Sequence, residues 1–75
     1  MSITIYTTPS CGFCSLAKSY FRERKLPFTE YDVSRDYNKA QEMVNKSGQM
    51  GVPVIEINGK VIVGFDKNRI DSALN

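Results

Sequence analysis

The chain has 75 residues, of which 41% are hydrophobic and 24% charged, and its formal net charge is +2. This length predicts a single domain over residues 1–75 with one hydrophobic core. No stretch approaches the ~20 apolar residues of a membrane helix, and the start lacks the basic and apolar regions of a secretory signal. We therefore expect a cytoplasmic monomer without a membrane partner, and the weak net charge argues against nucleic acid as a partner.

The first half of the chain has the pattern strand, helix, strand. Alternating apolar residues predict a strand over residues 3–6, which stops before Pro9. The next apolar residues recur at the spacing of one face of an amphipathic helix: Phe13, Leu16, Ala17, Tyr20 and Phe21. Pro27 should end this helix near Leu26, because proline disfavours helical geometry in the residue before it. A short alternating segment over residues 28–33 predicts the second strand.

A second helix should follow, with Ser34 as its N-cap and Gly48 as a left-handed residue at its end. The apolar residues that mark this helix are Tyr37, Ala40, Met43 and Val44. Two strands over residues 54–57 and 60–63 are then separated by an Asn-Gly pair, which is a strong hairpin signal.

Asp66 is the expected N-cap of a last helix that runs to about Leu74. The order βαβαββα predicts the α/β class, with a four-stranded mixed sheet flanked by three helices. The first two strands can lie parallel because a helix joins them, whereas the hairpin must be antiparallel.

Two cysteines, Cys11 and Cys14, stand at the junction of the first strand and the first helix, where a C-x-x-C pair is typical of redox sites. Residues three apart on a helix have Cβ atoms ~5–6 Å apart, which suits a disulfide. Cys11 lies at the helix start, where free N–H groups and the helix dipole stabilise a thiolate, so we expect it to be the nucleophile. Cys14 lies one turn deeper, aligned with Ala17 and Phe21, and is the expected resolving cysteine.

This pair predicts thiol–disulfide exchange through a mixed disulfide, with an external reductant that reopens the Cys11–Cys14 bond. A purely structural disulfide is the first alternative, but a loop this short would add little stability. A zinc site is the second, but zinc needs four ligands and the chain offers two cysteines and no histidine. We therefore expect no bound metal or other cofactor.

Three motifs together resemble the glutaredoxin branch of the thioredoxin superfamily: the cysteine pair that opens a helix, Val52-Pro53 before a strand, and Gly64-Phe65-Asp66 before the last helix. The resemblance covers essentially the whole chain and implies a minimal thioredoxin-like fold. It also implies a cis-proline at Pro53 beside the cysteines, with the backbone of Val52 paired to substrate. The substrate-binding residues that it implies are Ser10, Gly12, Phe13, Val52, Pro53, Gly64, Phe65 and Asp66.

The resemblance bears on the electron donor as well. Many glutathione-linked glutaredoxins carry a lysine where this chain has Thr8, and paired glycines and aspartates where it has residues 63–67. Gly64-Phe65 is more similar to the redoxins that take electrons from thioredoxin reductase, although the Arg-Pro that usually follows is Asp66-Lys67 here. The expected partners are protein disulfides, with a flavoprotein disulfide reductase or glutathione as the reductant.

Two other functions stay open from the residues alone. Some glutaredoxins carry an iron–sulfur cluster between two copies, and Cys11 would supply the protein ligands of such a cluster. A redox-gated binding module would instead use the open or closed cysteine pair to select a partner. Phe13 is expected at the surface beside bound substrate, although helical periodicity would bury it. Lys18, two helical turns from Cys11, could add a little positive potential, but we expect it on a solvated helix face.

Overall fold

The computed structural model describes residues 1–75. The elements in chain order are β1 (Ile3–Thr7), α1 (Gly12–Glu23), β2 (Thr29–Asp32), α2 (Tyr37–Ser47), β3 (Val54–Ile57), β4 (Lys60–Val63) and α3 (Lys67–Leu74). They form one sheet with the strand order β2-β1-β3-β4, in which only β1 and β2 are parallel. The α/β class and the mixed sheet with three helices are therefore confirmed. None of the helices is long and apolar enough to cross a membrane.

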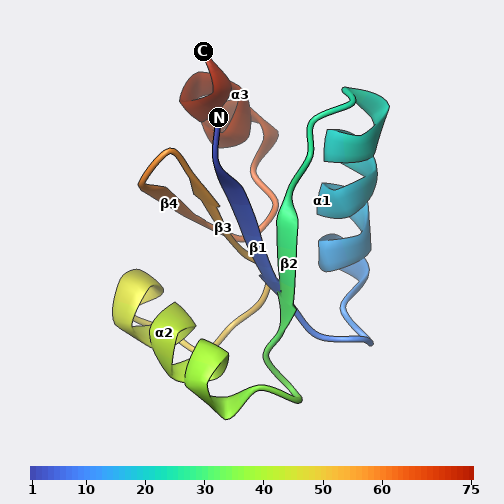
Figure 1. Ribbon diagram of the computed structural model, residues 1–75. Helices are drawn as coiled ribbons and strands as arrows, with labels where there is room; N and C mark the ends of the chain where they lie inside the picture. Colours follow the sequence, from blue (N-terminus) through green and yellow to red (C-terminus); the bar gives the residue numbers. More distant parts are fainter.

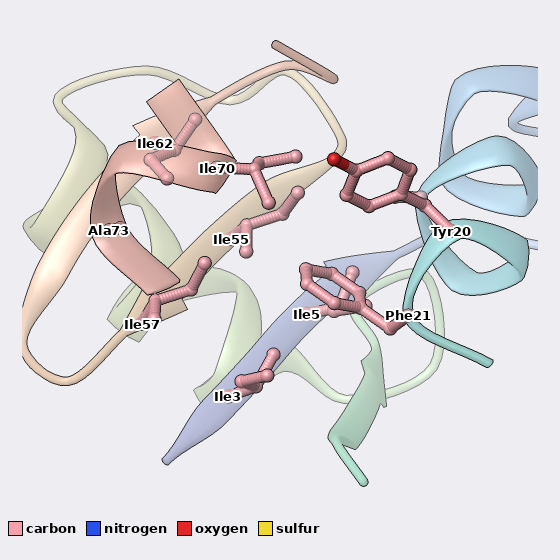
Figure 2. Close-up of a cluster of buried hydrophobic side chains, with 10 residues drawn as sticks. Ile3, Ile5, Tyr20, Phe21, Ile55, Ile57, Ile62, Ile70 and Ala73 are labelled. Carbon is pink, nitrogen blue, oxygen red and sulfur yellow. The ribbon is translucent and has the colours of Figure 1, made fainter. Parts of the chain in front are cut away.

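Each face of the sheet carries its own apolar cluster, because side chains alternate between the faces along every strand. Helices α1 and α3 cover one face, and α2 covers the other (Figure 1). On the first face, Phe21 of α1 and Ile70 of α3 pack with Ile5 and Ile55 of the central strands (Figure 2). The apolar cluster on the face under α2 is smaller and is built around Met43.

The strand register brings three loops to one edge of the sheet. Tyr6 of β1 lies opposite Val54 of β3, and Val54 lies opposite Val63 of β4. The end of β1, the start of β3 and the end of β4 are therefore neighbours. The backbone N–H of Gly64 donates to the Pro53 carbonyl at 2.8 Å and fastens two of these loops together. The cysteine loop follows β1 at this same edge.

Most local signals acted as predicted. Gly48 ends α2 in the left-handed region with φ 78°, and Asp66 caps α3 through the Arg69 N–H. The hairpin turn has positive φ at both Asn58 (49°) and Gly59 (87°). These geometries depend only on residues next to one another in the chain, which explains why the sequence revealed them.

Two helix boundaries differ from the prediction. The N-cap of α2 is Asp36, whose carboxylate accepts the Lys39 N–H at 3.1 Å, and not Ser34. Ser34 instead belongs to a turn, where its N–H donates to the Asp32 carboxylate. Helix α1 ends at Glu23, earlier than the predicted Leu26, because Lys25 adopts a left-handed φ of 56°.

Two of the apolar residues from which the helices were predicted are exposed. Leu16 of α1 keeps 51% of its surface exposed, and Tyr37 at the start of α2 keeps 74%. Helix α1 meets the sheet along Cys14, Ala17 and Phe21, so the side of the helix that carries Leu16 faces solvent. The spacing of the apolar residues therefore located the helices, but it did not define how wide a face of each helix is buried.

Replacing Phe21 with alanine should lower the free energy of unfolding by ~3–5 kcal/mol, the usual cost of removing a buried aromatic ring. Phe21 is fully buried between α1 and the sheet. Urea unfolding of the oxidised protein measures the change. Leu16→Ala on the same helix is the matched control, and its exposed side chain should change stability by less than ~0.5 kcal/mol. Equal effects of the two substitutions would contradict the assigned core.

Candidate active site

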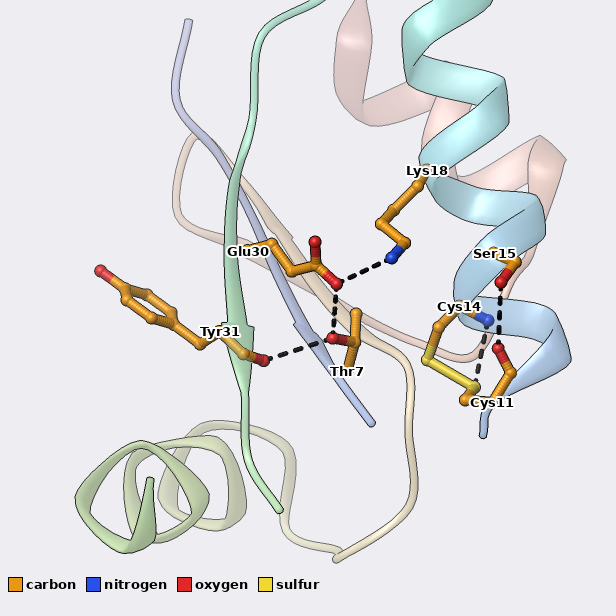
Figure 3. Close-up of a disulfide and its surroundings, with 7 residues drawn as sticks. All are labelled: Thr7, Cys11, Cys14, Ser15, Lys18, Glu30 and Tyr31. Carbon is orange, nitrogen blue, oxygen red and sulfur yellow. Dashed lines mark hydrogen bonds and ion pairs between the residues drawn. A yellow bond between two sulfur atoms is a disulfide. The ribbon is translucent and has the colours of Figure 1, made fainter. Parts of the chain in front are cut away.

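The two cysteines form a disulfide at the start of α1, with their Cα atoms 5.2 Å apart (Figure 3). Cys11 is the N-cap residue, and its Sγ accepts the Cys14 backbone N–H at 3.0 Å. The sulfur thus takes the place that a serine or aspartate oxygen fills at other helix starts. The same N–H and the helix dipole would stabilise a thiolate on Cys11 once the disulfide opens.

The two cysteines differ in their exposure. Cys14 is 1% exposed and lies against the sheet, whereas Cys11 is half-buried. Its neighbour Gly12 is exposed, and Phe13 keeps 64% of its surface open to solvent. The prediction that Phe13 lies at the surface is confirmed. Only the Cys11 side of the disulfide is open to a large reactant.

The loops at the same edge of the sheet hold the other predicted site residues. The Val52–Pro53 peptide bond is cis, Pro53 is buried and Val52 is half-buried. The Gly64 N–H donates a hydrogen bond to the Pro53 carbonyl, and Gly64 has a φ of 82°, a conformation that favours glycine. The structure therefore brings Val52, Pro53 and Gly64 to the edge at which β1 delivers the cysteines.

The remaining predicted residues are placed differently. Ser10 lies exposed in the turn before Cys11. The ring of Phe65 packs edge-on against Tyr20, with centroids 5.7 Å apart, and so belongs partly to the core. The Asp66 carboxylate caps α3, where it accepts the Arg69 N–H at 3.2 Å. Asp66 and Phe65 therefore have structural roles whatever they contribute to binding.

One group of residues near the disulfide escaped the sequence analysis. The hydroxyl of Thr7, which is 2% exposed, donates to the Glu30 carboxylate at 2.8 Å, and Lys18 Nζ lies 2.9 Å from the same oxygen (Figure 3). Lys18 and, to a lesser degree, Thr7 hold the pKa of Glu30 below its ordinary value. The expectation that Lys18 lies on a solvated helix face was wrong, since its side chain is 22% exposed and paired.

A signal for this group does exist in the sequence. Glu30 is two residues after Phe28, which packs on the cluster under α1 and α3, so strand alternation places Glu30 on the same face. Lys18 follows Cys14 by four residues and shares its side of α1. No group of three or more histidine, cysteine or acidic side chains is arranged to hold a metal ion.

A thioredoxin-like fold with a cysteine pair at the start of its first helix defines a redoxin of the thioredoxin superfamily. The glutaredoxin family model matches residues 3–62, and the chain belongs to the glutaredoxin family.

Similar proteins agree with this assignment. The chain is 42% identical over 72 residues to an uncharacterized glutaredoxin-like 8.6 kDa protein in the rubredoxin operon of Clostridium pasteurianum, covering 96% of both chains. It is 29% identical to the structure of Escherichia coli NrdH-redoxin, with a TM-score of 0.82 and coverage of 96% of this chain and 93% of that one. A glutaredoxin of Archaeoglobus fulgidus shares the fold at 14% identity, with a TM-score of 0.90 over 99% of this chain and 86% of that one.

Glu30 should make folding stability depend on acid. Its pKa is lowered in the folded chain from the ordinary 4.5, so the ionised carboxylate stabilises the fold above that pH, and this stabilisation is lost as the pH falls through the lowered value. We expect Glu30→Gln to reduce the free energy of unfolding by ~0.2–1 kcal/mol near neutral pH, the range for a partly exposed ion pair. Urea unfolding at a series of pH values tests this. A difference that persists in strong acid would contradict it.

Proposed function

We propose that the protein is a dithiol–disulfide oxidoreductase that reduces protein disulfides, with Cys11 as the nucleophile and Cys14 as the resolving cysteine. The unequal exposure of the two cysteine residues is the observation that carries this proposal. Cys11 is half-buried at the helix start, and Cys14 is 1% exposed behind it. A substrate disulfide can therefore reach Cys11 first, and Cys14 is close enough to form a disulfide with Cys11 afterwards.

The reaction has two exchange steps. The Cys11 thiolate attacks one sulfur of the substrate disulfide, a mixed disulfide forms, and the other substrate sulfur leaves as a thiolate that takes up a proton. Cys14 then loses its proton and attacks Cys11, which releases the second substrate thiol and closes the Cys11–Cys14 bond. An external reductant supplies two electrons and two protons to reopen the pair. The chain needs no bound cofactor for these steps.

The edge loops supply a surface for the substrate backbone. Val52 precedes β3 with its backbone unpaired to any other strand, and the next residue, Pro53, accepts the Gly64 N–H. Phe13 projects from the first turn of α1 beside Cys11. We assign substrate contacts to Ser10, Gly12, Phe13, Val52, Pro53, Gly64, Phe65 and Asp66, with Phe65 and Asp66 acting mainly by shaping the loop after β4.

For the electron donor we propose a flavoprotein of the thioredoxin reductase type rather than glutathione. Glutathione carries two carboxylates, and Thr8 offers no cation at the position where many glutathione-linked relatives have lysine. Asp66 is already used as the cap of α3. The similar NrdH-redoxin of Escherichia coli is described as a glutaredoxin-like protein with a thioredoxin-like activity profile.

Serine substitutions should separate the two cysteine roles. Cys11→Ser should abolish reduction of a model protein disulfide, because no exposed thiolate remains to attack it. Cys14→Ser should instead accumulate a covalent complex with the substrate, which intact-mass spectrometry under non-reducing conditions detects. Turnover that survives in Cys11→Ser would overturn the proposed function.

The donor is tested by NADPH-coupled turnover in two parallel assays. We expect activity with thioredoxin reductase and little with glutathione plus glutathione reductase. Thr8→Lys restores the missing cation and should raise the glutathione-linked rate by up to ~5-fold, the effect of one exposed ion pair, while it leaves the other assay unchanged. Efficient turnover of the parent protein with glutathione alone would contradict the assigned donor.

A further inference from the structure

The Lys18–Glu30 ion pair lies on the same side of the sheet as the disulfide (Figure 3). The ammonium group of Lys18 comes from α1 and the carboxylate of Glu30 from β2. The buried Thr7 joins them from the last position of β1, where its hydroxyl donates to the same carboxylate oxygen at 2.8 Å. Three elements thus converge on one carboxylate below the first turns of α1.

Lys18 stands close to Cys14 because the two residues are four apart on one helix. Side chains at this spacing have Cβ atoms ~5–6 Å apart on the same helix face. Both side chains face the sheet, since Cys14 is buried and Lys18 reaches Glu30. The ammonium group therefore lies on the same side of α1 as the sulfur that must act as the second nucleophile.

The other charged side chains on this side of the sheet have contacts of their own. Arg22, further along α1, places its guanidinium over the Phe28 ring at 5.6 Å, and its charge also helps to lower the pKa of Glu30. At the start of α3, Asp66 pairs with Arg69, and Lys67 lies beside the Tyr20 ring. The charged residues of α2 and β3 that interact with one another lie across the sheet: Lys39, Glu42, Lys46 and Glu56.

The chemistry of the resolving step gives this placement a role. Cys14 must lose its proton before it attacks Cys11, and burial opposes the charged thiolate. A nearby ammonium group favours that thiolate, whereas a carboxylate disfavours it. The bond that forms is Cys14–Cys11, the bond that breaks joins Cys11 to the substrate, and the departing substrate thiolate takes up a proton.

We propose that Lys18 is a positioning residue that stabilises the Cys14 thiolate, and that Glu30, itself held by the Thr7 hydroxyl, keeps the ammonium group below α1 and offsets its charge. This role rests on the proposed function, because it concerns the second step of the same exchange. It predicts opposite effects for the two members of one ion pair. Loss of Glu30 leaves Lys18 without its paired carboxylate and favours the thiolate, whereas loss of Lys18 leaves Glu30 with only the more distant charge of Arg22 and opposes the thiolate.

The test measures ionisation directly and needs no substrate. In a reduced Cys11→Ser background, the thiolate absorbance near 240 nm is followed against pH, so that Cys14 is the only cysteine observed. Glu30→Gln should lower the midpoint by about half a pH unit, and Lys18→Met should raise it by a similar amount. These sizes correspond to single charges screened by partial exposure.

The matched control is Glu56→Gln, which breaks the Lys46–Glu56 pair of 2.8 Å on the opposite face of the sheet. It should leave the Cys14 midpoint unchanged, and circular dichroism should show that all three variants are folded. A purely structural role for the pair would move both midpoints in the same direction or not at all, and either result overturns the inference. This outcome is independent of turnover, so it is distinguishable from a failure of the proposed function.

Discussion

The central constraint of this structure is the pairing of β1 with a strand on each side. β1 lies parallel to β2 and antiparallel to β3, and its inward residues are almost completely buried. The register of this pairing fixes the end of the sheet at which the chain leaves β1 after Thr7. Cys11 consequently reaches the start of α1 at the edge where the loops before β3 and after β4 also lie. A shift of β1 by one residue would turn every side chain to the other face and separate the site from these loops.

Two sources of positive potential converge on the cysteine pair from this arrangement. The first is the start of α1, where the Cys14 N–H points at the Cys11 sulfur. The second is Lys18, which reaches the sheet and is restrained by Glu30. The helix start acts on the sulfur of the half-buried Cys11, and the ion pair lies on the side of α1 that carries the buried Cys14. The two cysteines can therefore be tuned separately, although only three residues divide them in the sequence.

The helices on the two faces of the sheet are held by different kinds of contact. The face under α1 and α3 holds the larger apolar cluster, which fixes α1 and hence the cysteines. The face under α2 is held partly by polar contacts, in which the Tyr6 hydroxyl donates to Glu42 at 2.8 Å and accepts from Lys46 at 3.2 Å. Burial and the hydrogen bond to Glu42 raise the pKa of Tyr6, and the contact with Lys46 opposes this rise. The charged network of α2 anchors that helix at a distance from the redox site.

Local features of the sequence specify the element order, the hairpin turn, the cap at Asp66 and the cysteine pair at a helix start. Each of these depends on residues within a few positions of one another, through periodicity, turn conformation or capping. Contacts between distant segments, by contrast, leave Leu16 and Tyr37 in solvent. They also bring Lys18 to the Glu30 carboxylate that accepts the Thr7 hydroxyl. Those outcomes depend on which side of α1 meets the sheet and on how β2 aligns with β1, and both are set by contacts between segments far apart in the chain.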